Sequence, residues 1–325
     1  MISLRRTCRQ VVVLMLLGWG VTAIAESPPT NWPQQRPIRW IVPFPPGASA
    51  DAISRVVAQK LSEKIGQSVI VESRGGASGQ IAHDLVATSR PDGHTVLFVV
   101  PGIITNQYYM KNAVNAFKDL LPVIQLDNAP MVLLSRSAFK PTSLVQVLEA
   151  IRAKPDAVSC AAAGSLPQIG CELLRKYAQA DLLMVPFRGQ AQASNSVIAG
   201  DVDLMFDVIG SAISWINTNR LHAIAVTSEQ RAASLPNVPA ANESVPGFKL
   251  VTWHGVMVPS GTPPVIVAKM NAALNEVLKE PQVRERLEAL KLEVAGGSVE
   301  AFAALMKRDN ATYKALLEAA GVKPE

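Results

Sequence analysis

The chain has 325 residues, of which 49% are hydrophobic and 18% are charged, and its formal net charge is +5. This length and apolar content can bury a large core and favour two domains over one. Beyond the first 25 residues there is no run rich in lysine and arginine and no basic patch with interleaved aromatic residues. Nucleic acid is therefore not expected as a partner.

Residues 1–25 have the pattern of a secretory signal peptide. Three arginines precede an apolar block at residues 11–17, and Ala23-Ile24-Ala25 offers a small-x-small cleavage site. A membrane anchor would need about 20 apolar residues, whereas this block is interrupted after residue 17. We expect export and cleavage near Ala25, which removes three basic residues and no acidic one, so that the net charge falls to +2.

Two cysteines, Cys160 and Cys171, follow the signal-peptide pattern, eleven positions apart. An exported protein with such a pair can form one disulfide. Two buried thiols fit the sequence equally well, because spacing does not show whether the Cβ atoms meet. The four histidines are scattered, with no CxxC motif and no histidine pair at helical spacing. Neither a metal site nor a cofactor is expected.

From about Pro37 short apolar runs alternate with helical patterns, which predicts βαβ units and a mostly parallel sheet. The first strands are expected at residues 38–44, 68–72 and 95–100. In the first helix, Ile53, Val57 and Leu61 recur at helical spacing and Gly66 provides a stop, so one face of this helix should pack on a sheet.

A second α/β series begins after Pro122. Its strands are expected at residues 131–134, 158–163, 182–187, 204–209 and 221–227, with helices at 143–153, 172–179 and 194–199. The chain ends with a strand at 250–258 and helices at 262–279, 281–290 and 298–320.

No flexible linker separates the two series, so we expect strands to cross between two lobes and the C-terminal part to return to the first lobe. The predicted division is residues 26–125 plus 251–325 for lobe 1 and residues 126–250 for lobe 2. Ligands of open parallel sheets bind beyond the carboxyl ends of the strands, which directs attention to the loops at those ends.

Four strand-to-helix junctions place glycine or small residues before a helix N-terminus, at residues 45–51, 74–79, 163–168 and 186–190. The first turn of a helix leaves amides unpaired and carries a partial positive charge, so it can hold an anion. Taken singly, each loop is better explained as a turn or cap, with Ser49 as an N-cap and Asp51 favouring the dipole. Four such loops together favour a carboxylate, since no GxxxxGK[ST] phosphate motif is present.

An alternative is a secreted serine hydrolase that uses Ser49. Residues 47–51 resemble a G-x-S-x-G nucleophile elbow, and His222 or His254 would be the base. The match fails at its last position, where Asp51 replaces glycine, and it follows the first strand instead of a strand deeper in the sheet.

Six segments in order make the chain resemble a known family. They are IVPFPPGASAD, VIVESRGGASG, PDGHTVLF, AAAGSLPQIGCELL, VPFRGQAQA and GDVDLMFD. They are similar to the signature segments of the Bug (TctC-like) family, the periplasmic solute-binding proteins of tripartite tricarboxylate transporters. The resemblance runs from about Pro37 to the C-terminus.

The resemblance implies an α/β, two-lobed periplasmic binding protein fold of type II, a Venus flytrap with a ligand cleft between the lobes. It implies a periplasmic location, no catalysis and a small organic acid as ligand: a di- or tricarboxylate, an aromatic acid or an acidic amino acid. The implied partners are membrane transporter subunits or a membrane sensor, and a monomer is expected. The implied ligand-binding residues are Phe44, Ala48, Ser49, Ala50, Asp51, Ala77, Ser78, Gly79, Gly164, Ser165, Gln168, Arg188, Gly189 and Asp207.

The chain departs from the family pattern in several of these loops. The usual glycine and threonine of the first loop are replaced by residues 48–50, the usual proline of the second loop by Gly75, and a frequent histidine by Gln168. The donors to the common carboxylate are mostly backbone amides, so recognition of that carboxylate should persist. The departures leave open which group lies at the far end of the ligand.

Several side chains near this site have two interpretations. Arg188 is either a clamp for a second acidic group or a surface residue beside the cleft. Asp207 either receives an amine or a bridging water, or caps local backbone. Phe44 and Phe187 either wall the pocket or belong to the core.

Overall fold

The structure is a computed structural model, and it describes residues 31–187 and 189–319. The predicted signal peptide therefore lies outside the described residues. The strands are β1 (Ile38–Val42), β2 (Val69–Ser73), β3 (Thr95–Val99), β4 (Leu120–Arg136), β5 (Ser159–Ala162), β6 (Leu183–Pro186), β7 (Leu204–Val208), β8 (Leu221–Val226), β9 (Val251–Pro259) and β10 (Glu293–Val294). The helices are α1 (Ser49–Ile65), η1 (Ala77–Gly79), α2 (Gln80–Ala87), α3 (Gly102–Tyr109), α4 (Leu144–Ala153), α5 (Ser165–Ala178), α6 (Gln190–Ala199), α7 (Ile209–Asn217), α8 (Ala241–Ser244), α9 (Pro264–Lys279), α10 (Pro281–Ala289) and α11 (Val299–Ala319).

The first group of strands has the order β2-β1-β3-β9-β4. β1 pairs in parallel with β2 and β3, whereas β9 is antiparallel to both β3 and β4. The register pairs Val42 with Ser73, so the carboxyl ends of β1 and β2 lie together. The loops that precede α1 and α2 therefore start from neighbouring points of one edge.

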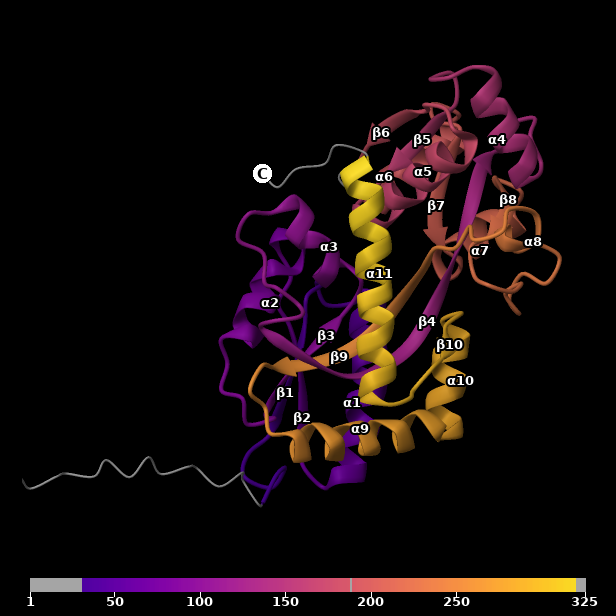
Figure 1. The fold of residues 1–325 in the computed structure, drawn as a ribbon. Coiled ribbons are helices and arrows are strands. Elements are labelled where there is room, and N and C mark those ends of the chain that lie inside the picture. The colour runs from indigo at the N-terminus through magenta and orange to yellow at the C-terminus, as the bar shows by residue number, and fades with distance from the viewer. Residues whose placement is uncertain (1–30, 188, 320–325) are drawn as a thin grey trace, which may run out of the picture. The chain divides into compact units, whose positions relative to one another are not determined.

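The second group of strands continues from β4 in the order β4-β7-β5-β6, with β8 also paired to β4. β5 is parallel to both β6 and β7. β4 belongs to both groups, because its residues 120–130 pair with β9 and its residues 131–136 pair with β7 and β8. This long strand, seen in Figure 1, joins the two groups of strands.

The helices cover the sheet with the faces that their sequences indicate. α1 buries Ile53, Val57 and Leu61, packs against α9 and α10, and ends at Gly66 with φ 64°. Both predictions for this helix are confirmed. Figure 1 shows the long helix α11, which contacts α3, α5 and β4. No helix within the described ranges has the length and hydrophobicity needed to cross a bilayer.

The observed boundaries differ from the predicted ones mainly at polar or proline-containing segments. The strand predicted at residues 131–134 is the end of a strand that starts at Leu120, and the helix predicted at 172–179 starts at Ser165. Helix α6 likewise starts at Gln190 instead of Ser194, and α7 follows β7 where only a strand was predicted.

Candidate functional site

The loop between β1 and α1 is organised by Asp51, a residue that is 6% exposed. Its carboxylate accepts hydrogen bonds from the Gly47 amide (3.2 Å), from Arg55 Nε and Nη2 (2.9 and 3.0 Å) and from Ser73 Oγ (3.3 Å). The hydrogen bond from Arg55 is the largest cause that lowers the pKa of Asp51. Asp51 therefore fixes the loop to α1 and β2, and its carboxylate is already occupied.

The N-terminus of α1 presents free amides. The N-cap is Ala48 and no side chain caps the helix, so the interpretation of Ser49 as N-cap is wrong. The Asp51 and Ala52 amides bond to Ala48 O, whereas those of Ser49 and Ala50 have no partner in the described part of the chain. Two amides at the positive end of a 17-residue helix suit an anion.

The loop between β2 and α2 is held in an unusual backbone conformation. Residues 76–79 all have positive φ, and two of them, Ala77 (46°) and Ser78 (53°), are not glycine. Such angles cost about 1–3 kcal/mol each and concentrate at functional sites. The Ser78 carbonyl accepts a hydrogen bond from Asn106 Nδ2 (3.1 Å), which helps to hold this turn.

The first two loops pack against each other through glycine. A Cβ on Gly75 would lie 3.2 Å from Pro45 N, and a Cβ on Gly79 would lie 3.1 Å from Pro43 Cβ. An added Cβ at either glycine would crowd these atoms, so the two loops lie in close contact. The structure therefore brings the predicted residues of the first lobe together.

The predicted residues of the second lobe lie at the carboxyl ends of β5, β6 and β7. Gly164 is the N-cap of α5 with φ 92°, and Gln168 is half-buried in its first turn. Gly189 precedes α6, whose Gln190 donates from Nε2 to Phe206 O (2.8 Å). Arg188 lies outside the described residues, so both interpretations of it stay predictions.

Asp207 stabilises local backbone. It is 5% exposed, and its Oδ1 accepts a hydrogen bond from the Val208 amide (2.8 Å). Burial raises the pKa of Asp207 to about 6, against the smaller lowering effects of that amide, Gln190 and Ser211. Of the two interpretations, the structure favours a cap of local backbone, at the Val208 amide.

Both phenylalanines pack against core residues. Phe44 is half-buried against the hydrophobic cluster that α1 shares with the first sheet. Phe187 is half-buried against the cluster beneath α6 and α7. The core interpretation therefore fits both side chains better than the pocket wall.

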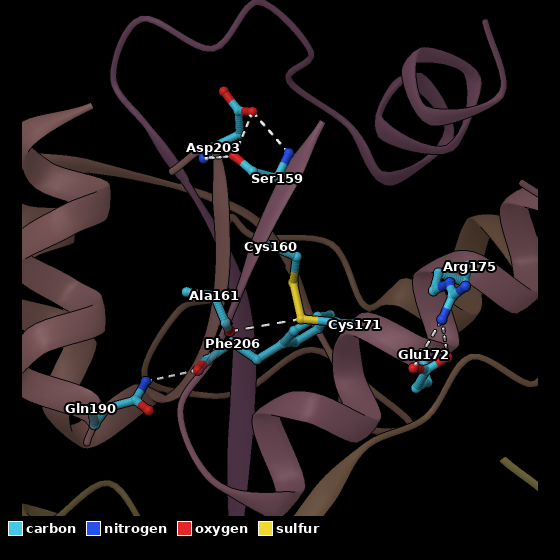
Figure 2. The surroundings of a disulfide bond; sticks show 9 residues. All are labelled: Ser159, Cys160, Ala161, Cys171, Glu172, Arg175, Gln190, Asp203 and Phe206. Atoms are coloured by element: carbon cyan, nitrogen blue, oxygen red, sulfur yellow. Dashed lines mark hydrogen bonds and ion pairs between the residues drawn. A yellow bond between two sulfur atoms is a disulfide. The ribbon is translucent and has the colours of Figure 1, made fainter. Parts of the chain in front are cut away.

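Cys160 of β5 and Cys171 of α5 form a disulfide with Cα atoms 6.0 Å apart. Figure 2 shows the bond beside the Phe206 ring, which lies close because residue 170 is glycine. A Cβ at Gly170 would come within 2.4 Å of the ring. The disulfide closes the segment that contains the Gly164 loop, so it restrains that loop.

A cavity of about 320 Å³ connects residues of both groups of strands. It is lined by Ser49, Ala129, Pro130, Val208, Ile209, Gly210, Ser211, Ile213, His254, Ala289, Leu290, Lys291 and Leu292. Ser49 is the one predicted ligand-binding residue in this lining. A larger hollow of about 840 Å³, which includes Trp253 and Asp309, contains none of the predicted residues. We call the 320 Å³ space the hinge cavity, because its wall includes the crossing strand β4.

A buried pair beside the hinge cavity was not predicted. His254 of β9 is 8% exposed, and its Nδ1 lies 2.6 Å from Asp127 Oδ1 of β4. Asp127 is fully buried, and its Oδ2 has no hydrogen-bond partner among the described residues. The His254 ring stacks on Phe98 at 5.2 Å. An acidic residue between the apolar runs of residues 120–136 was the sequence signal that could have indicated this pair.

Within the described ranges, no group of three or more histidine, cysteine, aspartate or glutamate side chains is placed to hold a metal ion. The donors of the two first-lobe loops are backbone amides and hydroxyls. Such donors suit a carboxylate held by hydrogen bonds.

Comparison with known protein families gives a match over residues 53–322, to the model described as the tripartite tricarboxylate transporter family receptor. A Pseudomonas sp. protein encoded in the tcbD-tcbE intergenic region is 38% identical over 287 residues, which are 87% of this chain and 85% of that protein. Protein BugT of Bordetella pertussis is 33% identical over 260 residues, which are 78% of this chain and 80% of that protein.

Solved structures are similar over nearly the whole chain. Periplasmic binding protein BugD has a TM-score of 0.74 at 31% identity, over 90% of this chain and 99% of that one. A Rhodopseudomonas palustris structure with adipate has a TM-score of 0.77 at 27% identity, over 91% and 100%. MatC from the same species, with bound malate, has a TM-score of 0.73 at 30% identity, over 87% and 99%.

Proposed function

Because this chain belongs to the tripartite tricarboxylate transporter receptor family, we propose that it captures a small organic carboxylate between two lobes and delivers it to a membrane transporter. The family resemblance and the two-lobed periplasmic binding protein fold expected from the sequence are confirmed. Family members are periplasmic binding proteins. Cleavage near Ala25, a monomeric state and delivery to a transporter instead of a sensor are parts of the proposal.

The free amides of Ser49 and Ala50 are the observation that carries the carboxylate assignment. They lie at the N-terminus of α1, where the helix dipole favours negative charge. The strained Ala77 and Ser78 of the neighbouring loop support the same site. Adipate and malate in the two R. palustris structures are also small carboxylates, so we infer the same class of ligand here.

The lobes of the proposal are residues 26–125 with 251–325, and residues 126–250. The pairing of β4 supports this division, because its residues 120–130 pair with β9 and its residues 131–136 pair with β7 and β8. The second lobe contributes Gly164, Ser165, Gln168 and Gly189 from the loops after β5 and β6. Closure must add contacts from these loops that the open state lacks.

A thermal-shift screen tests the function. Residues 26–325, freed of bound ligand by unfolding and refolding, are heated with mono-, di- and tricarboxylates, aromatic acids, and acidic and neutral amino acids. A ligand at a hundred times its dissociation constant adds about 2.7 kcal/mol to stability and raises the melting temperature. Stabilisation by carboxylates but not by neutral amino acids is expected, and a panel without any stabilising acid would contradict the proposal.

Two substitutions at Ser49 separate the amide from the hydroxyl. Ser49→Pro deletes both donors and suits the first helical position, because Ala48 already has the extended conformation that precedes proline (φ −70°, ψ 162°). Ser49→Ala deletes the hydroxyl alone. We expect the affinity of Ser49→Pro to be about tenfold lower than that of Ser49→Ala, because only the proline removes the amide hydrogen bond to the charged carboxylate. Equal affinities of the two variants would argue against the amide.

The hydrolase alternative has one observation in its favour. Ser49 and His254 line the same cavity, and His254 is paired with Asp127, which are the residue types of a catalytic triad. No hydrogen bond joins Ser49 to His254 within the described residues. We propose binding without turnover, so a fluorophosphonate probe should not label Ser49. Labelling that His254→Gln abolishes would establish the hydrolase instead.

A further inference from the structure

The hinge cavity combines cationic and hydroxyl groups with an apolar wall. Its polar side chains are Ser49, Ser211, His254 and Lys291, and its lining includes no carboxylate. Lys291 is exposed and takes part in no ion pair with a described residue. A volume of about 320 Å³ lies at the lower end of the range for small-molecule sites, which is about 300–1,000 Å³.

Two helix N-termini meet at this cavity. Ser49 is the first residue of α1, and Ile209 is the first residue of α7; neither helix has a capping side chain. The close approach of α7 depends on Gly210, since a Cβ there would lie 2.8 Å from Leu290 O. The two positive helix ends thus follow strands of different groups and surround one space.

The buried histidine supplies an independent observation. Asp127 Oδ1 at 2.6 Å from Nδ1 orients the imidazole, which leaves Nε2 as the ring nitrogen available to the cavity. The remaining Asp127 oxygen is buried without a described partner. The pair therefore fixes the direction in which Nε2 can form a hydrogen bond to an acidic group in the cavity.

We propose that the hinge cavity is the subsite for the second acidic group of the ligand, with His254 and Lys291 as its donors and Asp127 as the positioning residue for His254. This inference rests on the proposed carboxylate-binding function, in which the first carboxylate lies on the amides of Ser49 and Ala50. Val208, Ile213, Leu290 and other apolar lining residues contact the carbon chain between the two acidic groups. The receptor thereby selects dicarboxylates over monocarboxylates of equal length.

Matched acids and matched variants test the subsite by isothermal titration calorimetry. The probes are succinate with butyrate, glutarate with pentanoate, and adipate with hexanoate. The variants are His254→Gln, which keeps an amide donor for Asp127, and Lys291→Gln, with Lys269→Gln as control. Lys269 is exposed on α9 and lies outside the cavity, so its variant makes the same change in charge.

We expect the wild type to bind at least one dicarboxylate about tenfold or more tightly than its partner monocarboxylate. His254→Gln and Lys291→Gln should each remove most of that preference, while their monocarboxylate affinity stays within about twofold of the wild-type value. Lys269→Gln should bind both acids as the wild type does. If His254→Gln does not fold, the exposed Lys291 gives the same test.

Three results would overturn the inference. Equal binding of both members of every pair, with no effect of either variant, would reject the subsite and leave the carboxylate receptor intact. An equal loss of affinity for both acids of a pair in these variants would show that His254 and Lys291 have a structural role and do not contact the second acidic group. A wild type that binds no carboxylate would reject the proposed function together with the subsite.

Discussion

The disulfide between Cys160 and Cys171 allows a prediction whose magnitude follows from the chain. A disulfide stabilises mainly by restricting the unfolded chain, and for a sequence separation of 11 the loop-entropy relation gives about 3 kcal/mol. Unfolding about 300 residues has an entropy of about 0.6 kcal/mol/K, so reduction should lower the melting temperature by about 5 °C. The reduced protein should also hold the Gly164 loop less rigidly.

The assay is differential scanning calorimetry of residues 26–325 with and without a phosphine reductant. Thiols titrated in denaturant provide the control, with none expected before reduction and two after it. Two free thiols in protein isolated from the periplasm would refute the disulfide. An unchanged melting temperature after confirmed reduction would refute the entropic reasoning, because both sulfurs are buried and no other bond is altered.

Three further predictions concern the loops. Asp51→Asn should lower the free energy of unfolding, measured in urea, by about 1.5–3 kcal/mol, because it loses charge-assisted hydrogen bonds. The control Glu63→Gln changes an exposed ion pair and should lower the free energy of unfolding by less than about 1 kcal/mol. Equal losses would contradict the role of Asp51 as the anchor of its loop. The pKa of Asp207 is raised to about 6 from 3.8, so the folded state holds the proton more tightly. The free energy of unfolding should therefore fall by about 3 kcal/mol in total as the pH rises from below about 3 to above about 7, with most of the change between about 4 and 6. Asp207→Asn should lack this part of the pH dependence, and an identical profile would refute it. Gly79→Ala should destabilise more than Gly66→Ala, because both residues have positive φ but only Gly79 has neighbours within 4 Å of the added Cβ; thermal melts would decide.

The general course of the fold could be predicted because local signals agree with the tertiary structure. The spacing of Ile53, Val57 and Leu61 alone indicates the buried face of α1, and Gly66 indicates its end. The four strand-to-helix loops could be located for the same reason, since small residues after an apolar strand are a local pattern.

The boundaries that were wrong depend on partners far away in the sequence. β4 contains Asp127, Asn128 and Pro130, which interrupt its apolar pattern, so its first half was not predicted as strand. Pairing with β9 overrides this, and Asp127 finds its partner His254 at a separation of 127 residues. Helix α5 starts before Pro167 because proline is tolerated in the first turn of a helix.

Side-chain roles were predicted less well than positions for the same reason. Asp51 is in the predicted loop, but its four hydrogen bonds, one of them to Ser73 of the next strand, consume its carboxylate. His254 was predicted only as a possible catalytic base, because no local sequence pattern connects it to Asp127. The residues that distinguish this receptor's ligand from another's are therefore those that sequence patterns find last.

The position of the hinge cavity also bears on how binding is coupled to closure. A ligand shifts a conformational equilibrium only by its difference in affinity between the two states. A monocarboxylate held by the Ser49 and Ala50 amides alone contacts one sheet and gains little from closure. A dicarboxylate that also reaches His254, Lys291 and the N-terminus of α7 contacts both sheets, so its binding energy favours the closed state. On the proposal above, the binding free energy of the second acidic group is also the free energy that favours the closed state. A variant that no longer binds the second acidic group should therefore also fail to signal closure to the transporter.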